Sequence, residues 1–227
     1  MLRSVYSMSG FTVQATDKAI GTVREFLFDA NAWEIRYMVF DPDHQIAGRN
    51  VVIAPVAFGK PVWEARQFPV LLTQDQVRTG PDKECEQRKT AHLHSTQEVM
   101  GCRVQALDGE IGCVEDLIVD DDVWGIAYII VKIEQWQPER EVLIAPDWIT
   151  EVQWHKKTMS VDLSGERIKY SPEYNPADPV NREYEIQLYD FYGRPRPKNW
   201  TDFASTPDIP SSKWNGSEKD AGKRDEA

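Results

Sequence analysis

The sequence predicts an all-β protein built from two copies of one small unit and followed by an amphipathic helix. Three observations lead to this prediction. The stretch from Ile20 to Phe40 recurs between Ile111 and Val131, 91 positions later. The same offset aligns most of both halves without a gap. The segments are short, rich in β-branched and aromatic residues, and separated by turn residues. One offset sustained over this length indicates an internal duplication, so we predict two small β-barrels in tandem.

The extent of the repeat sets the predicted boundaries. Unit 1 spans residues 5–82, a polar linker spans 83–95, and unit 2 spans 96–173. A connector punctuated by prolines and a helix follow at 174–200. The last residues, 201–227, are polar, and we expect them to be disordered. Two repeats are too few for a solenoid, which favours two small domains over a repeat array.

Each unit is predicted to contain short strands in the same order. In unit 1 these strands cover residues 11–15, 21–29, 34–40, 50–53 and 69–72. The turn DANAW joins the second strand to the third, and DDDVW takes its place in unit 2, so we expect a β-hairpin in each unit. Closure of each sheet into a barrel would leave no exposed edge strand.

The third predicted strand is apolar on both faces in each unit. Met38 and Phe40 share one face in unit 1, and Ile129 and Val131 are their counterparts in unit 2. The opposite face is also mostly apolar, whereas a strand with water on one side alternates apolar with polar residues. We therefore expect one face to fill the barrel and the other to be covered by the sister unit, by a helix or by another copy of the chain. The last alternative leads us to expect a homodimer.

An amphipathic helix is predicted after unit 2. Val180, Tyr184, Leu188 and Phe191 recur at helical spacing, and Gly193 can end the helix. We expect this aromatic stripe to pack on a barrel or to serve as a docking face, since Tyr is favoured at interfaces. The candidate interaction surface joins the helix to the third strands and comprises Met38, Phe40, Ile129, Val131, Tyr184, Leu188, Tyr189 and Tyr192.

Composition and charge narrow the classes of function. The chain has 26 Lys and Arg against 37 Asp and Glu, which gives a formal net charge of −11. Nucleic-acid binders take most of their affinity from Lys and Arg on phosphates, so we expect a basic protein partner and no direct nucleic-acid binding. No apolar run is long enough to span a membrane and no signal peptide is seen, so the cytoplasm is the expected location. The odd number of cysteines fits free thiols in a reducing compartment.

Two clusters of ligand-type side chains are candidates for metal sites. Asp120, Asp121 and Asp122, with Asp116 nearby, form a dense acidic turn that is typical of a solvated hairpin and, less often, of a weak Ca²⁺ or Mg²⁺ site. The other cluster comprises Cys85, His92, His94 and Cys102. It lacks the tight ligand pairs of zinc sites, which favours a linker with exposed histidines. We assign no metal to either cluster.

No residue is predicted to be catalytic. The sequence contains no nucleophile motif such as G-x-S-x-G and no Gly-rich phosphate loop. We therefore expect a protein that is not an enzyme and that uses no cofactor.

The residues shared by the two units resemble the PRC-barrel domain. Both units contain I-G-x-V, an Asp before a tight turn, then W-x-I-x-Y and V-x-I-A-P. The module is similar to the cytoplasmic domain of the photosynthetic reaction centre H subunit and to the C-terminal domain of the ribosome maturation factor. The segment REYEIQLYDFYGRPRPKNW is similar to the ending of bacterial tandem PRC-barrel proteins.

This resemblance implies a small β-barrel used for protein–protein contact, with no catalytic residues to carry over. The H subunit carries a membrane-spanning helix before its barrel, and the maturation factor carries a different N-terminal domain, so neither role transfers directly. Three roles stay open. They are an adapter protein, an accessory factor in ribosome maturation or RNA processing that acts through a basic protein, and a cytoplasmic partner of a photosynthetic or other electron-transfer membrane complex.

Overall fold

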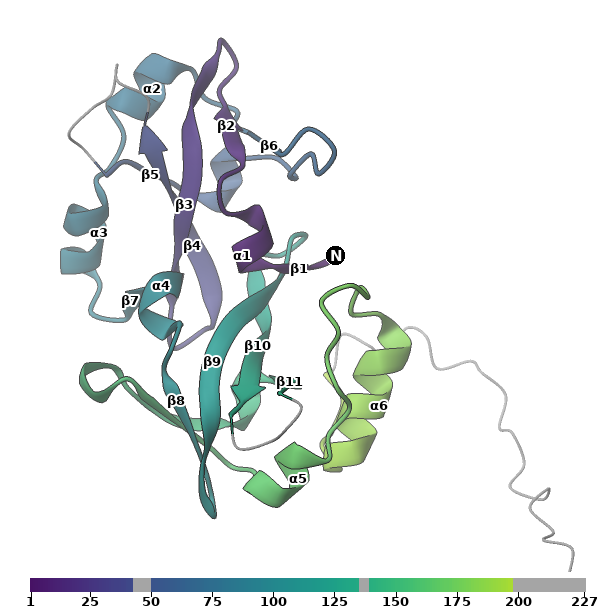
Figure 1. Ribbon diagram of the computed structural model, residues 1–227. Coiled ribbons are helices and arrows are strands. Elements are labelled where there is room, and N and C mark those ends of the chain that lie inside the picture. Colours follow the sequence, from purple (N-terminus) through teal and green to yellow (C-terminus); the bar gives the residue numbers. More distant parts are fainter. Residues whose placement is uncertain (43–49, 135–138, 198–227) are drawn as a thin grey trace, which may run out of the picture. The chain divides into compact units, whose positions relative to one another are not determined.

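One continuous sheet dominates the computed structural model, which describes residues 1–42, 50–134 and 139–197 (Figure 1). Hydrogen-bonded neighbours follow the order β12-β13-β8-β9-β10-β4-β3-β2-β6, and β1, β5, β7 and β11 attach to this path from the side. The path is open at both ends, so the two closed barrels predicted from the sequence are not confirmed. The tail predicted at 201–227 lies outside the described residues.

The elements follow a similar order in both halves, and the second half has an additional strand and an additional 3-10 helix before its last strand. The first half contains β1 (Leu2–Ser4), α1 (Val5–Met8), β2 (Thr12–Gln14), β3 (Ala19–Asp29), β4 (Glu34–Pro42), β5 (Val52–Ile53), η2 (Pro55–Ala57), β6 (Gln67–Pro69), α2 (Gln74–Arg78) and α3 (Lys83–Lys89). The second half contains β7 (Leu93–Ser95), α4 (Thr96–Val99), β8 (Arg103–Ala106), β9 (Gly109–Asp120), β10 (Gly125–Ile133), β11 (Arg140–Ile144), η3 (Pro146–Trp148), β12 (Ile149–Gln153), η4 (Trp154–Lys156), β13 (Thr158–Val161), α5 (Gly165–Lys169) and α6 (Arg182–Tyr192).

The duplication extends to the register of the strands. In the first half β2 runs parallel to β6, and Thr12 pairs with Gln67. In the second half β8 runs parallel to β13, and Arg103 pairs with Thr158, which is the same pairing shifted by the repeat offset. Each half also forms the predicted hairpin, β3 with β4 and β9 with β10. The expected repeat of β-strand units is therefore present in the backbone.

The two halves meet at their hairpin turns through a reciprocal pair of hydrogen bonds. The backbone N–H of Ile35 donates to the carbonyl of Trp124 at 2.8 Å, and the N–H of Ile126 donates to the carbonyl of Trp33 at 2.7 Å. Because Trp124 and Ile126 are the repeat counterparts of Trp33 and Ile35, the contact has local two-fold symmetry. It joins β4 to β10, which explains why one sheet takes the place of two separate barrels.

Each half also lends a short strand to the other half. The first strand of the chain, β1, pairs antiparallel with β9, and Ser4 lies opposite Ile118. Its counterpart β7 pairs antiparallel with β3, and Ser95 lies opposite Leu27. The segment predicted as a linker, 83–95, thus contains α3 and a strand of the sheet. The exchange gives hydrogen-bond partners to edges of β3 and β9 that would otherwise be open.

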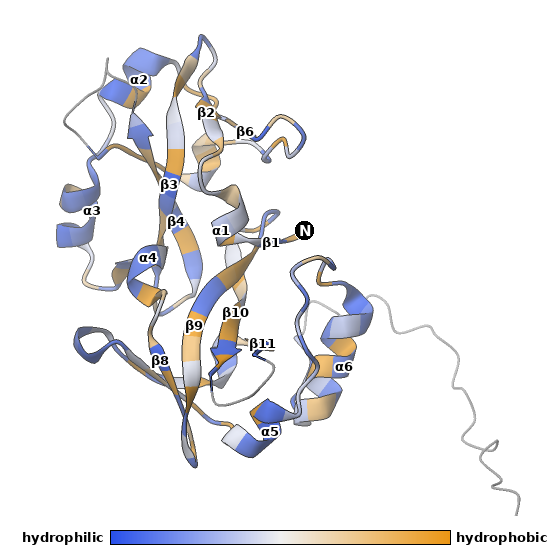
Figure 2. Cartoon of the chain, viewed as in Figure 1, coloured by the Kyte–Doolittle hydropathy of each residue, from blue (hydrophilic) through white to orange (hydrophobic). Residues whose placement is uncertain are grey.

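The predicted amphipathic helix is present as α6. Asn181 caps its start by accepting from the N–H of Tyr184 at 2.9 Å, and Gly193 ends it with a φ of 62°. Such a left-handed conformation suits glycine at a helix end. Figure 2 shows apolar residues along the strands and within α6. Within the described ranges, no helix is both long and apolar enough to cross a membrane.

Candidate functional site

The residues predicted as an interaction surface are almost all inside the chain. Those that the structure buries are Met38, Phe40, Ile129, Val131, Leu188, Tyr189 and Tyr192. Tyr184 is half-buried, and its hydroxyl donates to the carbonyl of Pro172 at 3.1 Å. These side chains therefore contribute to the core, and the surface of this unit must be sought elsewhere.

The helix α6 covers the outer face of the second half. Tyr189 and Tyr192 pack against Trp148 with ring centroids 5.3 and 4.8 Å apart. The hydroxyl of Tyr128 on β10 donates to Glu185 of α6 at 2.8 Å. Of the three covers expected for the apolar third strand, a helix is thus the one observed for this half. The double apolarity of β10 no longer calls for a second copy of the chain, and the homodimer stays a prediction.

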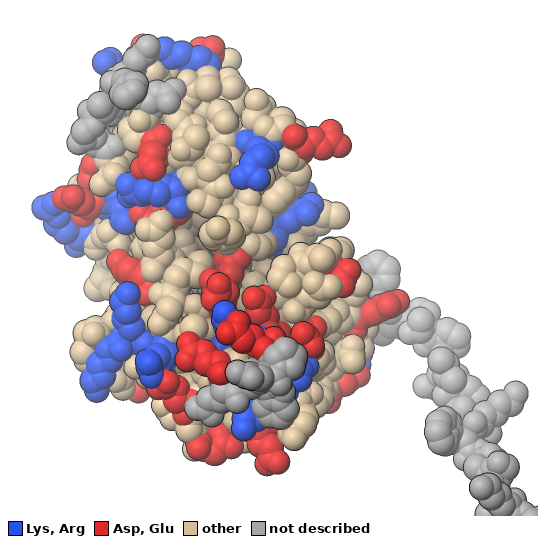
Figure 3. Space-filling view, viewed as in Figure 1, with Lys and Arg blue, Asp and Glu red and all other residues tan. Residues whose placement is uncertain are grey.

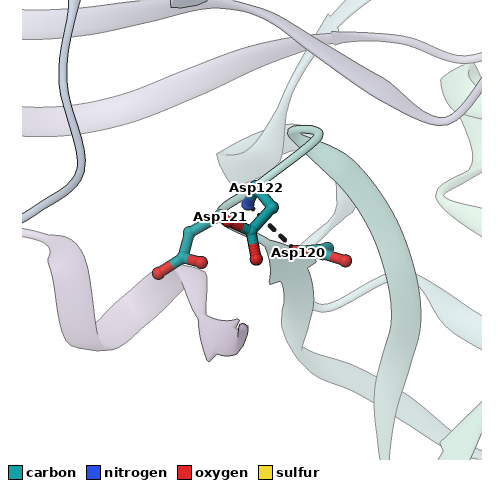
Figure 4. Close-up of side chains that lie close together, drawn as sticks. All are labelled: Asp120, Asp121 and Asp122. Atoms are coloured by element: carbon teal, nitrogen blue, oxygen red, sulfur yellow. Dashed lines mark hydrogen bonds between the residues drawn. The ribbon is translucent and has the colours of Figure 1, made fainter.

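The three aspartates of the second hairpin turn lie close together (Figure 4), and cations of the same chain pair with them. Their carboxylate oxygens lie within 4.8 Å of one another. The amino nitrogen of Met1 lies 2.6 Å from Asp121, and the ammonium of Lys60 pairs with Asp122. The hydrogen bond from Lys60 is the largest cause that lowers the pKa of the Asp122 carboxyl to about 2. Ion pairs within the chain therefore supply positive charge to this cluster.

The second candidate metal cluster is not assembled. His94 stacks on Trp154 with ring centroids 3.7 Å apart, and its Nδ1 lies 3.1 Å from a carboxylate oxygen of Glu98. Cys102 is buried, and Cys85 is exposed on α3. Across the described residues, the only group of three or more close ligand atoms is the aspartate turn.

A buried carboxylate occurs at the same place in both halves, and from the sequence only one of the two, Asp116, is noted, as a neighbour of the aspartate turn. Glu25 of β3 is 4% exposed, and its repeat counterpart Asp116 of β9 is 7% exposed. Each accepts a hydrogen bond from the serine that the other half lends, Ser95 to Glu25 and Ser4 to Asp116. The strand exchange therefore builds two related sites, one around each acid.

In the first half the carboxylate is neutralised. The ammonium of Lys83 donates to Glu25 Oε1 at 2.7 Å. The guanidinium of Arg24 donates to the same oxygen at 2.9 Å and to the side chain of Asn50 at 3.2 Å. Burial raises the pKa of Glu25, but the hydrogen bonds from Lys83, Ser95 and Arg24 outweigh burial, and the pKa is lowered. Glu25 is thus a buried anion with its own cations.

In the second half each of these neighbours is replaced. Glu115 stands in the place of Arg24, Tyr174 in that of Lys83, and Glu141 in that of Asn50. The backbone is the same at both places: the N–H of Lys83 donates to the carbonyl of Asn50 at 2.7 Å, and the N–H of Tyr174 donates to the carbonyl of Glu141 at 2.8 Å. The second half therefore has two acids and a phenol where the first half has two cations and an amide, and the backbone hydrogen bond is the same in both.

The replacement leaves Asp116 without a cation. Over the ranges 1–42, 50–134 and 139–197, no ion pair joins a Lys or Arg to Asp116, Glu115 or Glu141. Lys132 lowers the pKa of Glu141 slightly from a distance, but its ammonium pairs with Glu139 at 2.7 Å. Asp116 Oδ1 accepts from the backbone N–H groups of Leu117 and Tyr6 at 2.7 and 3.1 Å.

The pKa values of the two acids shift in opposite directions. Burial raises the pKa of Asp116 above its ordinary value, and the hydrogen bonds from Ser4, Leu117 and Tyr6 offset burial only in part. Burial also raises the pKa of Glu141, and the charge of Glu115 adds to the increase. A carboxylate next to like charges and away from water disfavours its ionised form. The second-half site therefore favours the arrival of a positive charge.

A cavity of about 330 Å³ opens onto this acid. We call it the Asp116 cavity, and its lining comprises Ser4, Tyr6, Ser7, Glu115, Asp116, Ile130, Glu141, Tyr174 and Pro176. Figure 3 shows acidic side chains gathered on the second half, over β9, β10 and the neighbouring connector. The cavity is thus accessible, negatively charged and partly apolar.

The repeat alignment contains the signal that would have found this site. Glu25 and Asp116 both interrupt an apolar strand pattern at the same position, and a single acid there reads as a surface residue. The charge reversal from Arg24 to Glu115 beside it is visible in the same alignment. What the sequence does not show is the burial, because the covering serine comes from the other half.

Comparisons with known proteins do not show the family of this chain. No protein-family model matches it. No curated protein matches it either. Among solved structures, it is similar to a Pseudomonas aeruginosa protein described as the 16S ribosomal RNA processing protein RimM. The two are 14% identical, the match covers 73% of this chain and 99% of that one, and the TM-score is 0.25. A TM-score this low is no basis for assigning either fold or function.

Proposed function

We propose that this chain is a non-catalytic interaction protein that holds a basic partner protein at the acidic side of its second half. One observation carries the proposal: the same buried carboxylate is neutralised by Lys83 and Arg24 in the first half and, among the described residues, by no cation in the second. A buried anion without a partner destabilises the folded state. A partner that places a positive charge beside Asp116 would remove this destabilisation, and the free energy gained would contribute to binding.

The charge of the whole chain supports a basic partner. A net charge of −11 steers cationic proteins toward the surface and raises their association rate. The PRC-barrel resemblance of both halves supports the same role, because it implies a small β domain used for protein contact. Cytoplasmic location and the absence of a cofactor are parts of this proposal.

An accessory role in ribosome maturation is a second candidate within the same proposal. Ribosomal proteins are basic, and the repeated motif resembles the C-terminal domain of the ribosome maturation factor. The acidic surface of the second half suits such a partner better than it suits RNA, since phosphates would be repelled.

The proposal is tested by crosslinking and affinity purification of the full chain from its source cell, read by mass spectrometry. The acidic pair is neutralised by Glu115→Gln with Glu141→Gln. The matched control neutralises two exposed acids elsewhere, Glu64→Gln with Glu151→Gln, so that both variants have the same net charge.

The expected result is that basic proteins are captured by the native chain and by the control and are lost from the Glu115/Glu141 variant. Ribosomal proteins among them would favour the maturation role, whereas subunits of a membrane complex would favour the H-subunit-like role. Equal capture by both variants, or recovery of the chain alone, would overturn the proposal.

A further inference from the structure

The chemistry of the group that enters the Asp116 cavity follows from the other half of the molecule. We propose that the cavity takes a lysine side chain of the partner, whose ammonium fills the place that Lys83 fills beside Glu25. This inference rests on the proposed function and adds to it the identity of the recognised group.

The first half shows what a filled site looks like. Lys83 is 17% exposed, and its ammonium reaches a carboxylate that is 2% exposed at the side chain. The α-carbon from which it extends has its counterpart at Tyr174, held by the same backbone hydrogen bond. Tyr174 makes no ion pair with Asp116, and burial, aided by the charges of Asp116 and Glu141, raises the pKa of its phenol. Asp116 and Tyr174 both line the cavity, so a group that enters it from outside reaches the acid beside this phenol.

The walls of the cavity suit the stem of a lysine. Tyr6, Ile130, Tyr174 and Pro176 present apolar surface around the acids. Lysine buries its methylene stem along such surface and keeps its charge at a polar end. A cavity of about 330 Å³ is within the size range of small-ligand sites.

The hydrogen bonds of Asp116 favour an ammonium over a metal ion. An ionised carboxylate offers about four lone-pair positions. Three of them are used here, by Ser4 on Oδ2 and by the N–H groups of Tyr6 and Leu117 on Oδ1. Ca²⁺ requires six to eight oxygen ligands in direct contact, and this carboxylate has only one position left to offer. A single ammonium needs only the position that remains, together with Glu141 and Glu115.

The same count favours lysine over arginine. A guanidinium binds a carboxylate best through two parallel hydrogen bonds to both oxygens. Oδ1 of Asp116 already accepts two backbone hydrogen bonds, so the paired geometry is blocked. An ammonium acts as a point charge and approaches Oδ2 alone.

The test is a titration of the full ¹⁵N-labelled chain followed by NMR. The probe is Nα-acetyl-lysine methylamide, and its Nε-acetylated form is the control that keeps the methylene stem and lacks the positive charge. The backbone amides of Tyr6 and Leu117 are the reporters, because both donate to Asp116. The amide of Phe26, beside Glu25, reports on the first half.

We expect the lysine probe to shift both reporters saturably and to leave Phe26 unmoved. The Nε-acetylated probe should bind at least about tenfold more weakly, since a charged hydrogen bond is roughly twice as strong as a neutral one. Asp116→Asn should weaken the lysine probe to a similar degree. If the two reporter signals shift with calcium chloride and not with the lysine probe, the cavity binds a metal cation and the inference is overturned. Equal shifts from both lysine probes would also contradict it.

A second variant keeps the test independent of any folding defect in Asp116→Asn. Tyr174→Lys places an internal ammonium where Lys83 stands in the first half, and it should abolish binding of the lysine probe in a folded chain. Undiminished binding to this variant would contradict the inference. Loss of partners from the Glu115/Glu141 variant without any response to the lysine probe would leave the proposed function standing and remove only the lysine assignment.

Discussion

At the scale of the residue, Glu25 and Asp116 occupy the same position of the repeat, but the charges around them differ. Both are buried in a strand, and both accept from a serine lent by the other half. Within the part of the chain that the structure describes, Glu25 has cations and Asp116 has none, because Tyr174 and Glu115 stand in the places of Lys83 and Arg24. The first half therefore shows how this acid behaves with cations beside it. We expect charge changes at Glu25 and at Asp116 to alter the stability of the chain in opposite directions.

Removal of the cation from the first half should destabilise the fold. Lys83→Met leaves Glu25 buried with Arg24 alone, and breaking a buried pair costs about 3 kcal/mol. The free energy of unfolding in urea at pH 7 measures this loss. Lys60→Met is the matched control, because Lys60 pairs with Asp122 at an exposed site. A Lys83 variant as stable as the Lys60 variant would show that Glu25 is not held as a buried anion.

The two acids should give opposite dependences of stability on pH. The folded pKa of Asp116 is raised, so the folded state binds more protons than the unfolded state, and stability falls as pH rises from the unfolded pKa through the folded one. The folded pKa of Glu25 is lowered, so its contribution is present above the unfolded pKa and is lost as pH falls through the folded one.

Unfolding measured across pH separates these contributions. Asp116→Asn should remove a loss of stability that the native chain shows as pH rises above the ordinary aspartate pKa. Glu25→Gln should remove a loss of stability that the native chain shows as pH falls below the ordinary glutamate pKa. If the curve of Asp116→Asn runs parallel to that of the native chain, Asp116 does not titrate as proposed.

At the scale of the element, the exchanged strands are the feature that ties the halves together. Leu93 of β7 packs in a buried cluster with Leu27, Val39 and Val52 of the first half. Leu93→Ala should therefore cost about 2–4 kcal/mol, as for other large-to-small changes in a core. Leu107→Ala is the control, because Leu107 is 71% exposed. Equal stability of the two variants would mean that residues 83–95 act as a simple linker.

Much of the arrangement of elements could be predicted from the sequence, and the exchange could not. The hairpins follow from the repeated motif around Trp33 and Trp124, and α6 follows from helical spacing ended by Gly193. The exchanged strands are only three residues long, LRS and LHS, and contain too few residues to show a period. Nothing local specifies whether such a strand pairs within its own half or with the other.

The site was missed for a related reason. Its acids were visible, but their burial depends on Ser4 and Ser95, which come from the opposite half. The residues that were chosen as a surface, such as Met38 and Ile129, are apolar on doubly apolar strands and belong to the core. The alternation of apolar and polar residues along a strand identifies buried apolar positions well. It does not show which polar residues of one half are buried by contact with the other half.

At the scale of the whole molecule, the two halves are expected to unfold together. Residues 1–194 form one unit, linked by the exchanged strands and by the reciprocal bonds at Trp33 and Trp124. Calorimetry of the full chain should give one transition with equal calorimetric and van't Hoff enthalpies. Two resolved transitions would indicate two independent domains.

The measurement that tests the account most directly is a ¹³C NMR titration of the side-chain carboxyl groups of Asp116 and Glu25 in the full chain. It reads, on the same molecule, whether one repeat position is neutralised and the other is not. We expect a pKa above the ordinary 3.8 for Asp116 and below the ordinary 4.5 for Glu25. Bound lysine probe should then lower the pKa of Asp116 alone. An Asp116 that titrates at or below 3.8 in the free chain would contradict the account, because its carboxylate would already have the charge partner that we assign to another protein.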